Sequence, residues 1–333
     1  MRQIVIAVAA AAALVAGSSG AGAAPTYHVE RRIPLPDGGW DLATFDTGSH
    51  RVYLARTDAI DAIDVQSGKV TVLAPAGRSH TVVAVNGGAE VLETDGATDA
   101  ARFIDARSGA ELATVKVGQG PDAALLDPAT GLALVMNARS GEVTLIDPRA
   151  HAVVGTIPVG GSLEIAVADG AGRVFVNVED RNEVVALDLK ARTARHIALT
   201  GCDGPTGIAY LPRSHRVLSA CGNGVVALTN ADTLAVERTL PLGQGPDTAM
   251  YDSPRGVALV PCGRSGDLWL FEDGAGGVSP AGHVATQRGA RTGALDPGTG
   301  RAYLPAADYL PPATPNGRPQ IKPGSVTLVV VGP

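Results

Sequence analysis

Short apolar runs alternate with polar turns along most of this chain. In one stretch, the apolar runs cover residues 123–126, 132–137, 142–146 and 153–159, with Gly, Pro, Asp and Ser between them. Runs of this length that are rich in Val, Ile and Leu indicate strands. The turn Asp127–Gly131 joins the first two runs, and it suits a tight reversal because proline restricts φ and glycine accepts positive φ. These features predict a unit of four antiparallel strands.

This unit recurs about every 41 residues. Its clearest marker is one position at the start of the first strand, which usually carries a charged side chain. Its seven occupants, here called the slot residues, are Asp41, His80, Asp122, Glu164, Thr206, Asp247 and Arg291. A fixed period of this size is typical of repeat architectures, in which each unit is one supersecondary element.

The two ends of the chain complement each other. The seventh unit shows only three strands before Pro333, whereas Arg32–Leu35 repeats the fourth-strand pattern of Thr156–Val159. We expect this N-terminal strand to complete the last unit and close the ring, which removes open edges. The predicted fold is an all-β, seven-bladed β-propeller of four-stranded antiparallel blades, with the last blade closed by the N-terminal strand.

The first 23 residues have the features of a secretory signal peptide. Arg2 precedes an apolar run over residues 4–16, and Ala21–Ala23 matches a small-residue cleavage site. The run is too short to span a membrane, and Ser18 stands where a lipoprotein signal needs Cys. We therefore predict one propeller domain over residues 24–333, exported to the periplasm or secreted, without a membrane anchor.

Composition limits the kinds of partner. The formal net charge of −6 disfavours nucleic acid and anionic membranes. Gly118–Ala123 matches a dinucleotide fingerprint, but an apolar strand follows it where a helix is required, so the match is rejected. No P-loop, Cys-x-x-Cys, His-Glu-x-x-His or nucleophile-elbow motif occurs. We expect a monomer that binds a small polar ligand or a partner protein.

The slot residues carry the candidate chemistry. The first strand of each propeller blade lines the central channel, so these side chains are expected to ring one channel mouth. Four carboxylates there repel one another unless arginine, water, protonation or a cation offsets their charge. This favours a Ca²⁺ or Mg²⁺ site with Asp122, Glu164 and Asp247 as candidate ligands, and His80 would admit other metals. The candidate ligand-binding residues are Trp40, Asp41, His80, Glu164, Thr206 and Arg291.

A structural role competes with this hypothesis. Asp122 and Asp247 both end a Gly-Gln-Gly-Pro-Asp segment, and a residue that repeats so regularly favours loop capping or bonding to the next blade. The slot residues that depart from this pattern are the better functional candidates. They are Asp41, His80, Glu164 and Arg291.

The loop between the second and third strands should lie on the same face as the slot residues. In the seventh unit it lengthens to Pro305–Pro323, a proline-rich segment. It predicts either a lid over the channel mouth or a rigid surface strap.

Several segments together resemble a known family. They are Gly118–Asp127, Gly160–Glu164, Cys202–Gly207, Cys221–Asn223 and Ala285–Leu304. In these segments the chain resembles the YncE-like β-propellers with YVTN-type repeats, a bacterial family of exported proteins, over nearly all of residues 24–333. The resemblance implies the propeller fold and export, but no particular reaction.

The three cysteines divide into a pair and a single residue. Cys202 lies in the loop before the fifth blade, Cys221 lies at the end of that blade's second strand, and both belong to the resemblance. In an oxidising compartment we expect them to form a disulfide. Cys262 occupies the position equivalent to Cys221 in the sixth blade and is expected to be free. The alternative is three reduced cysteines packed in the core.

The leading functional hypothesis is an exported binding or interaction module with a ligand or metal site at the channel mouth. The rival is a metal-dependent, lactonase-like hydrolase, in which Glu164 and Asp247 hold the metal and His80 is the general base. Against the rival, lactonase propellers have six blades, and no lactonase motif is present. A third hypothesis is a scaffold that binds proteins through its faces.

Overall fold

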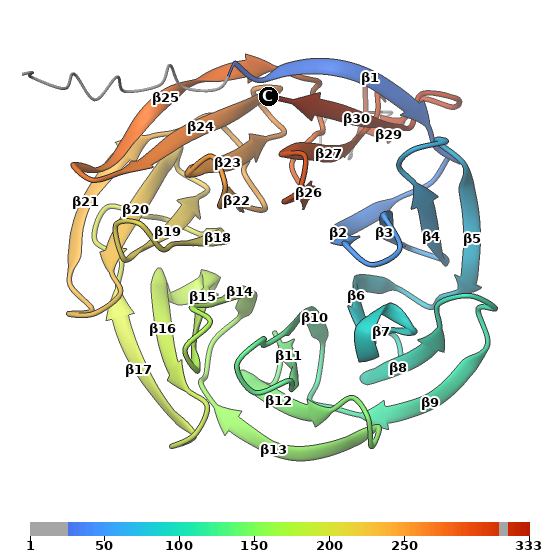
Figure 1. The fold of residues 1–333 in the computed structure, drawn as a ribbon, viewed down its shortest axis with the longest axis horizontal. Coiled ribbons are helices and arrows are strands. Elements are labelled where there is room, and N and C mark those ends of the chain that lie inside the picture. The colour runs from blue at the N-terminus through green and yellow to red at the C-terminus, as the bar shows by residue number, and fades with distance from the viewer. Residues whose placement is uncertain (1–25, 313–318) are drawn as a thin grey trace, which may run out of the picture.

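The computed structural model describes residues 26–312 and 319–333, and it confirms the seven-bladed propeller (Figure 1). The predicted signal peptide, residues 1–23, lies outside the described residues. Each blade is a four-stranded antiparallel sheet, and in the first six blades the strands run outward from the central axis in chain order. Among the described residues, no helix has the length and apolar character needed to cross a membrane.

The strands of the first three blades are as follows. Blade 1 contains β2 (Trp40–Asp46), β3 (Arg51–Arg56), β4 (Ala59–Asp64) and β5 (Val70–Pro75). Blade 2 contains β6 (Ser79–Val85), β7 (Glu90–Asp95), β8 (Ala100–Asp105) and β9 (Glu111–Lys116). Blade 3 contains β10 (Pro121–Leu126), β11 (Ala133–Asn137), β12 (Glu142–Asp147) and β13 (Ala152–Pro158).

The remaining blades continue the series. Blade 4 contains β14 (Leu163–Ala168), β15 (Arg173–Val178), β16 (Glu183–Asp188) and β17 (Thr193–Ala198). Blade 5 contains β18 (Pro205–Leu211), β19 (Arg216–Cys221), β20 (Val225–Asn230) and β21 (Val236–Pro241). Blade 6 contains β22 (Met250–Asp252), β23 (Val257–Cys262), β24 (Asp267–Gly274) and β25 (Gly277–Ala285). Two 3₁₀ turns, η1 (Asn86–Gly88) and η2 (Glu179–Arg181), lie in loops of blades 2 and 4.

The seventh blade is closed by the N-terminal strand, as predicted. It contains β26 (Ala294–Asp296), β27 (Arg301–Ala306), β30 (Thr327–Gly332) and, outermost, β1 (His28–Pro34). β1 pairs antiparallel with β30 from His28↔Gly332 to Pro34↔Thr327. The first and last described strands therefore lie side by side in one sheet (Figure 1).

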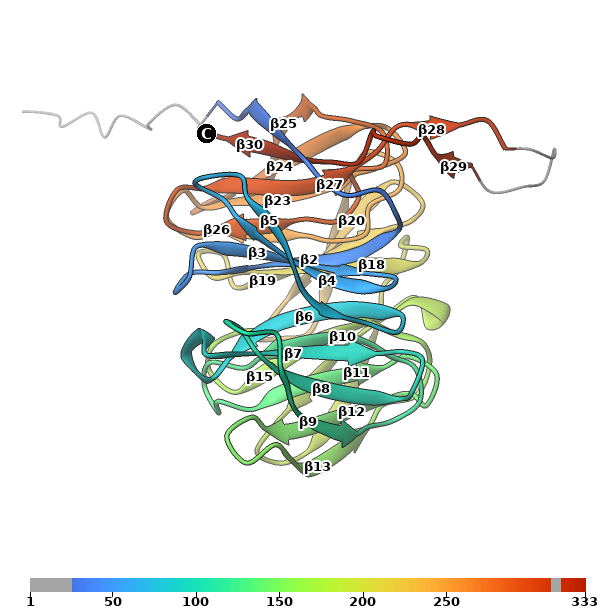
Figure 2. The ribbon, with the colours of Figure 1, turned by 90° about the vertical axis from the view of Figure 1, so that its right-hand side faces the viewer.

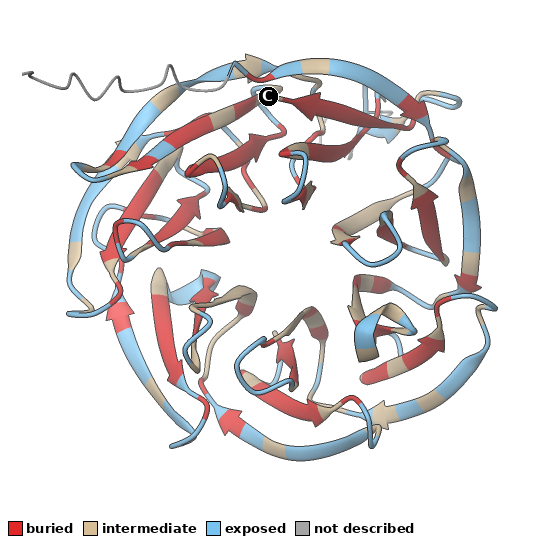
Figure 3. Ribbon diagram, in the orientation of Figure 1, coloured by how far each residue is buried: buried red, intermediate tan, exposed pale blue. Residues whose placement is uncertain are grey.

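The hydrophobic core lies between the blades. Seven clusters of buried side chains are found among the described residues, one at each interface between neighbouring blades. The interface of blades 7 and 1, for example, packs Ile33 and Leu328 against Val52 and Leu54. The outermost strands expose most of their residues (Figure 3). Each blade is thus stabilised by burying both of its faces against its neighbours.

Aspartates at the strand ends hold the turns that the sequence predicted. Asp127 Oδ2 accepts hydrogen bonds from the Thr130 backbone N–H at 2.8 Å and from Thr130 Oγ1 at 2.6 Å. Asp64 and Asp105 accept equivalent bonds from the serines three residues later. A short acidic side chain that bonds the backbone two or three residues ahead stabilises a reversal of the chain.

A short hairpin extends blade 7. β28 (Tyr309–Leu310) pairs with β29 (Gln320–Ile321) in the connection between β27 and β30. Pro305 and Ala306 belong to β27, so the predicted loop over Pro305–Pro323 begins two residues too early. Residues 313–318, part of that loop, lie outside the described residues. Figure 2 shows the described hairpin stem projecting from one face of the ring.

Candidate ligand site at the channel mouth

The slot residues occupy equivalent places in the blades. In blades 1 to 5 each is the second residue of the innermost strand, and the strand pairing shifts register at or just after it. Asp247 and Arg291 precede the shorter strands β22 and β26. A bulge of this kind redirects a side chain out of the regular pleat.

Three slot residues converge on one point. His80 Nδ1 lies 2.7 Å from Asp41 Oδ2 and 3.2 Å from Asp122 Oδ1. One ligand atom from each of the three residues lies within 4.8 Å of the others, and all three side chains are partly exposed. We call this group the Asp41–His80–Asp122 cluster. It brings one imidazole nitrogen and two carboxylate oxygens together at the mouth of the channel.

Electrostatics in this cluster favours a bound positive charge. The hydrogen bond with Asp41 raises the pKa of His80, although burial opposes the shift. Burial raises the pKa of Asp122 to about 6; the His80 charge lowers it and the Asp41 charge adds to the rise. A protonated imidazole between two carboxylates satisfies both, and a divalent cation would do the same.

Asp247 and Arg291 form a second pair. Arg291 Nε lies 2.7 Å from Asp247 Oδ2. Burial raises the pKa of Asp247 to about 6, against the effect of the Arg291 guanidinium, and the charges of Asp41 and Asp122 add to the rise. Asp247 therefore has a cationic partner of its own, in addition to its place among the channel carboxylates.

Glu164 has no such partner. Among the described residues it makes no hydrogen bond or ion pair, and burial together with the charges of nearby carboxylates raises its pKa to about 9. The contributing carboxylates are Asp122, Glu179, Asp247 and Asp41. Glu164 is therefore a neutral acid at neutral pH unless a cation binds next to it.

The carboxylates in the two Gly-Gln-Gly-Pro-Asp segments do not cap their loops. Among the described residues, neither Asp122 nor Asp247 accepts a hydrogen bond from a backbone N–H, and each faces another slot side chain. The loop geometry comes instead from Gly120 and Gly245, whose φ angles are +63° and +71°. Both regular copies instead contact a neighbouring blade, Asp122 through His80 of blade 2 and Asp247 through Arg291 of blade 7, as the structural alternative predicted. These contacts also place both carboxylates among the charged slot residues.

Other predicted residues are held by the scaffold. Thr206 Oγ1 donates to the Pro246 carbonyl at 3.3 Å, which links blade 5 to blade 6. Trp40 is partly buried and packs against the core between blades 7 and 1. Similar side-chain bonds to a neighbouring blade run from Thr81 Oγ1 to the Asp122 carbonyl at 2.8 Å and from Thr292 Oγ1 to the Asp41 carbonyl at 3.0 Å. These bonds fix the backbone that carries the slot residues.

Two residues near the site were not predicted. Glu179, in η2, adds negative charge near Asp122 and Glu164, and Arg78 lies close enough to lower the pKa of His80 and Asp122. Arg78 also lines a cavity of about 140 Å³ with His80 and Asp122. Arg78 lies two positions before the slot residue His80, and this spacing could have indicated its place near the site. Glu179 lies in a loop between second and third strands, the loop class that the sequence placed on this face.

The cysteine prediction is confirmed within the described residues. Cys202 and Cys221 form a disulfide with their Cα atoms 5.4 Å apart, and Cys262 is free and buried. Burial raises the pKa of the Cys262 thiol well above its usual range, so this thiol is unreactive at neutral pH.

Comparison with known proteins identifies the fold. No family model matches the chain, and neither does any curated protein sequence. A chain in the crystal structure of the mitotic checkpoint complex is 16% identical, with a TM-score of 0.75, and the match covers 100% of this chain and 99% of that one. The RRP9 WD40 repeats are 13% identical, with a TM-score of 0.73 and coverage of 90% and 97%.

Hydrazine synthase from Kuenenia stuttgartiensis is a third similar structure, 14% identical with a TM-score of 0.70 over 83% of this chain and 94% of that chain. Identities this low carry information about the fold and not about activity. With the sheet order described above, these likenesses show that the chain is a seven-bladed, WD40-like β-propeller.

Proposed function

We propose that this protein is an exported, YncE-like binding module that holds a divalent transition metal at its channel mouth. The observation that carries the proposal is the convergence of Asp41, His80 and Asp122 on one point. Imidazole and carboxylate together suit Zn²⁺ or a similar metal better than Ca²⁺ or Mg²⁺, which prefer oxygen ligands alone.

The geometry of the cluster fits a metal of this kind. Ligand atoms about 2.1 Å from a tetrahedral metal lie roughly 3.4 Å from one another. The separations of 2.7 and 3.2 Å from His80 Nδ1 are a little shorter, and small rotations of the partly exposed carboxylates would open them. Three protein ligands leave a fourth position for water or for a donor atom of a small ligand.

The first test is a calorimetric titration of the purified chain with Zn²⁺. We expect one site per chain, and the variants H80Q and D122N should weaken it at least about tenfold because each removes a metal ligand. The matched control is H196Q, because His196 Nδ1 also lies 2.7 Å from one carboxylate oxygen, on Glu183, but has no second carboxylate partner in the described part of the chain. Equal affinity in all four proteins, or no stoichiometric site, would contradict the proposal.

Export and the YncE-like relationship rest on the N-terminal sequence pattern and the blade-junction segments. The Cys202–Cys221 disulfide supports export, because such bonds persist mainly in oxidising compartments. Expression of the full chain in a bacterium with an outer membrane should give a periplasmic or secreted product that begins at Ala24. N-terminal sequencing checks this, and a cytoplasmic product that still carries the apolar segment would refute it.

A metal-dependent hydrolase is the second candidate. One observation favours it: Glu164, a carboxyl with a pKa of about 9, shares the channel with the metal-binding cluster and has the character of a general acid. The roles of Glu164 and Asp247 as paired metal ligands have less support, because Asp247 pairs with Arg291. Hydrolysis of γ-lactones by the Zn²⁺-loaded protein, lost in E164Q while Zn²⁺ still binds, would favour the enzyme over the binding module.

A further inference from the structure

A second cavity lies beside the channel mouth. Its volume is about 950 Å³, and it lies between the hairpin stem of blade 7 and the loops that join and cross blades 6 and 7. Volumes of this size are typical of small-molecule sites. Its lining includes no residue of the Asp41–His80–Asp122 cluster.

One wall of the cavity is cationic. It carries Arg264 from the β23–β24 loop, Arg288 from the β25–β26 loop, and Arg291. Among the described residues, the guanidinium groups of Arg264 and Arg288 have no ion-pair or hydrogen-bond partner, and Arg291 uses only Nε, toward Asp247. Neither undescribed segment, 1–25 or 313–318, contains an Asp or Glu to neutralise them.

The one acidic side chain of the lining is already engaged. Asp308 Oδ1 accepts a hydrogen bond from Gln287 Nε2 at 3.1 Å, which ties the base of the hairpin to the β25–β26 loop. Asp247 balances Arg291, so two guanidinium groups without ion-pair partners among the described residues, those of Arg264 and Arg288, face one carboxylate and make this a locally positive cavity, although the whole chain is acidic. Guanidinium donors of this kind bind carboxylates through paired, charge-assisted hydrogen bonds.

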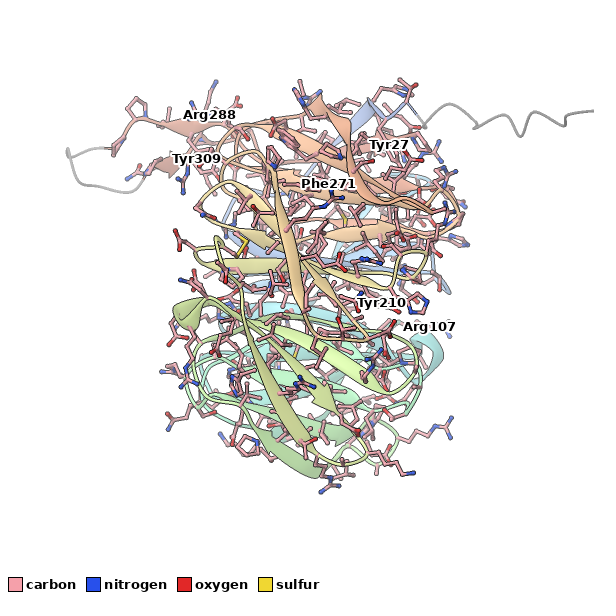
Figure 4. The ribbon with its side chains drawn as sticks, turned by 90° about the vertical axis from the view of Figure 1, so that its left-hand side faces the viewer. Tyr27, Arg107, Tyr210, Phe271, Arg288 and Tyr309 are labelled. Atoms are coloured by element: carbon pink, nitrogen blue, oxygen red, sulfur yellow. A yellow bond between two sulfur atoms is a disulfide. The ribbon has the colours of Figure 1, made fainter. Side chains whose placement is uncertain are left out.

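Another part of the lining is apolar. The hairpin stem supplies Tyr309 and Leu310, which are 43% and 42% exposed, followed by Pro311 and Pro312. Exposed side chains of this size offer a surface for a ring or an alkyl group. Figure 4 shows Arg288 and Tyr309 together at the hairpin, on the face opposite to Arg107.

Two glycines let the loops that line the cavity pack closely against each other. A Cβ on Gly289, whose φ is +91°, would lie 2.7 Å from Tyr309 Cε2, and one on Gly263 would lie 2.7 Å from the Arg291 Cβ. The Gly289 N–H donates to the Gly263 carbonyl at 2.7 Å, which fixes the two loops together. Tyr309 and Arg291 can therefore take these positions only because both neighbours lack side chains.

From these contacts we infer that the cavity lined by Arg264, Arg288, Arg291 and Tyr309 binds a small amphipathic anion, meaning a carboxylate attached to an apolar or aromatic body. The carboxylate is bound by the guanidinium groups, and the apolar body packs on Tyr309 and Leu310. The inference uses a different set of residues from the proposed metal site and goes beyond it.

The experiment uses 2-naphthoate as the probe and the full mature chain as the protein. We expect one saturable site by calorimetry, weakened at least about tenfold in the double variant R264Q/R288Q and in Y309A. The matched control is R107Q, since Arg107 is also exposed in a strand-joining turn but lies on the other face. R107Q should bind the probe like the wild type.

Two further ligands test the chemistry. Neutral 2-naphthalenemethanol should bind at least about tenfold more weakly than 2-naphthoate, because it lacks the negative charge. Inorganic phosphate should also bind at least about tenfold more weakly, because it lacks the apolar body. Equal binding of either ligand, equal binding of 2-naphthoate to R264Q/R288Q and wild type, or no saturable site would overturn the inference. The melting temperature of the same variants shows whether a loss of 2-naphthoate binding comes from misfolding. A Zn²⁺ titration of these variants shows whether the metal site is intact, so the two proposals can fail separately.

Discussion

At the scale of single residues, the molecule combines buried acids that gain a charge partner with buried acids that do not. Asp247 has Arg291, and Arg56 Nη1 lies 2.8 Å from Asp61 Oδ2 in the core of blade 1. Burial raises the pKa of Glu164 to about 9, with no ion-pair partner among the described residues, and that of Glu93 to about 7, despite the nearby Arg102 guanidinium. An acid of this kind costs stability when it ionises, so it makes the fold sensitive to pH.

Glu93 gives a prediction about pH. It is fully buried in β7, and neither oxygen accepts a well-formed hydrogen bond, although Arg102 Nη1 lies 3.2 Å from Oε2. Burial raises its pKa to about 7, against the effect of Arg102. Between about pH 4.5 and pH 7 the folded chain holds a proton that the unfolded chain has lost, so the free energy of unfolding falls as the pH rises. The loss expected from Glu93 alone is about 3 kcal/mol.

Chemical denaturation at several pH values checks this. The decline in E93Q should be smaller than in the wild type by about 3 kcal/mol, because residue 93 can no longer ionise. The remaining decline comes from the other acids with raised pKa values, Asp122, Asp247 and Glu164. The control is E272Q, since Glu272 is exposed in β24 and its replacement should leave the pH dependence unchanged. A decline of the same size in E93Q and wild type would show that Glu93 does not cause it.

At the scale of elements, a disulfide crosslinks the loop that enters blade 5 to the rest of that blade. The Cys202–Cys221 disulfide joins this loop to the end of β19 across 19 residues. Both cysteines are buried, and they lie in the cluster between blades 4 and 5. The crosslink therefore fixes the loop beside Thr206, the slot residue of blade 5, and restricts the unfolded chain.

Removal of this disulfide should lower stability. We expect the variant C202A/C221A to lose about 3 kcal/mol of unfolding free energy, from the loop-closure entropy that the crosslink removes from the unfolded state. Denaturant titrations with and without dithiothreitol measure it. Dithiothreitol should destabilise the wild type and C262A alike but leave C202A/C221A unchanged. A response of the double variant to the reductant would contradict the assignment.

At the scale of the whole molecule, closure of the ring depends on the strand β1. It covers the edge of β30 and places Ile33 and Leu35 in the core between blades 7 and 1. Without β1 that sheet would present an unpaired edge and an open cluster of apolar side chains. The closing strand therefore stabilises the ring as a whole as well as blade 7.

A truncation tests this dependence. A chain that begins at Pro36 should melt about 10 °C or more below a chain that begins at Thr26, because it loses two buried aliphatic side chains and a row of backbone hydrogen bonds. A synthetic peptide of residues 26–35, added in excess, should restore part of the difference by pairing with β30. Calorimetry measures both effects, and equal melting temperatures for the two chains would show that β1 is not needed for closure.

Much of this fold was predictable because its information is local and repeated. The turn at Asp127–Gly131, the apolar runs and the spacing of the slot residues each follow from a few neighbouring residues. Seven copies of the same pattern then determine the number of blades, and the fourth-strand pattern at Arg32–Leu35 indicates how the ring closes. The Cys202–Cys221 pair follows in the same way, since both positions map to one end of one blade.

The sequence by itself thus determined the architecture and the repeated position that supplies the charged slot residues, but not the neighbouring Arg78 and Glu179. Only the tertiary structure decided how they combine: Asp122 with His80 and Asp41, Asp247 with Arg291, and Glu164 with neither. These residues are about 40 positions apart in the chain, so their pairing depends on distances across the ring and on side-chain directions that no local pattern encodes. The same holds for the Arg264–Tyr309 cavity, which forms where loops of blades 6 and 7 meet the connection between blades 5 and 6.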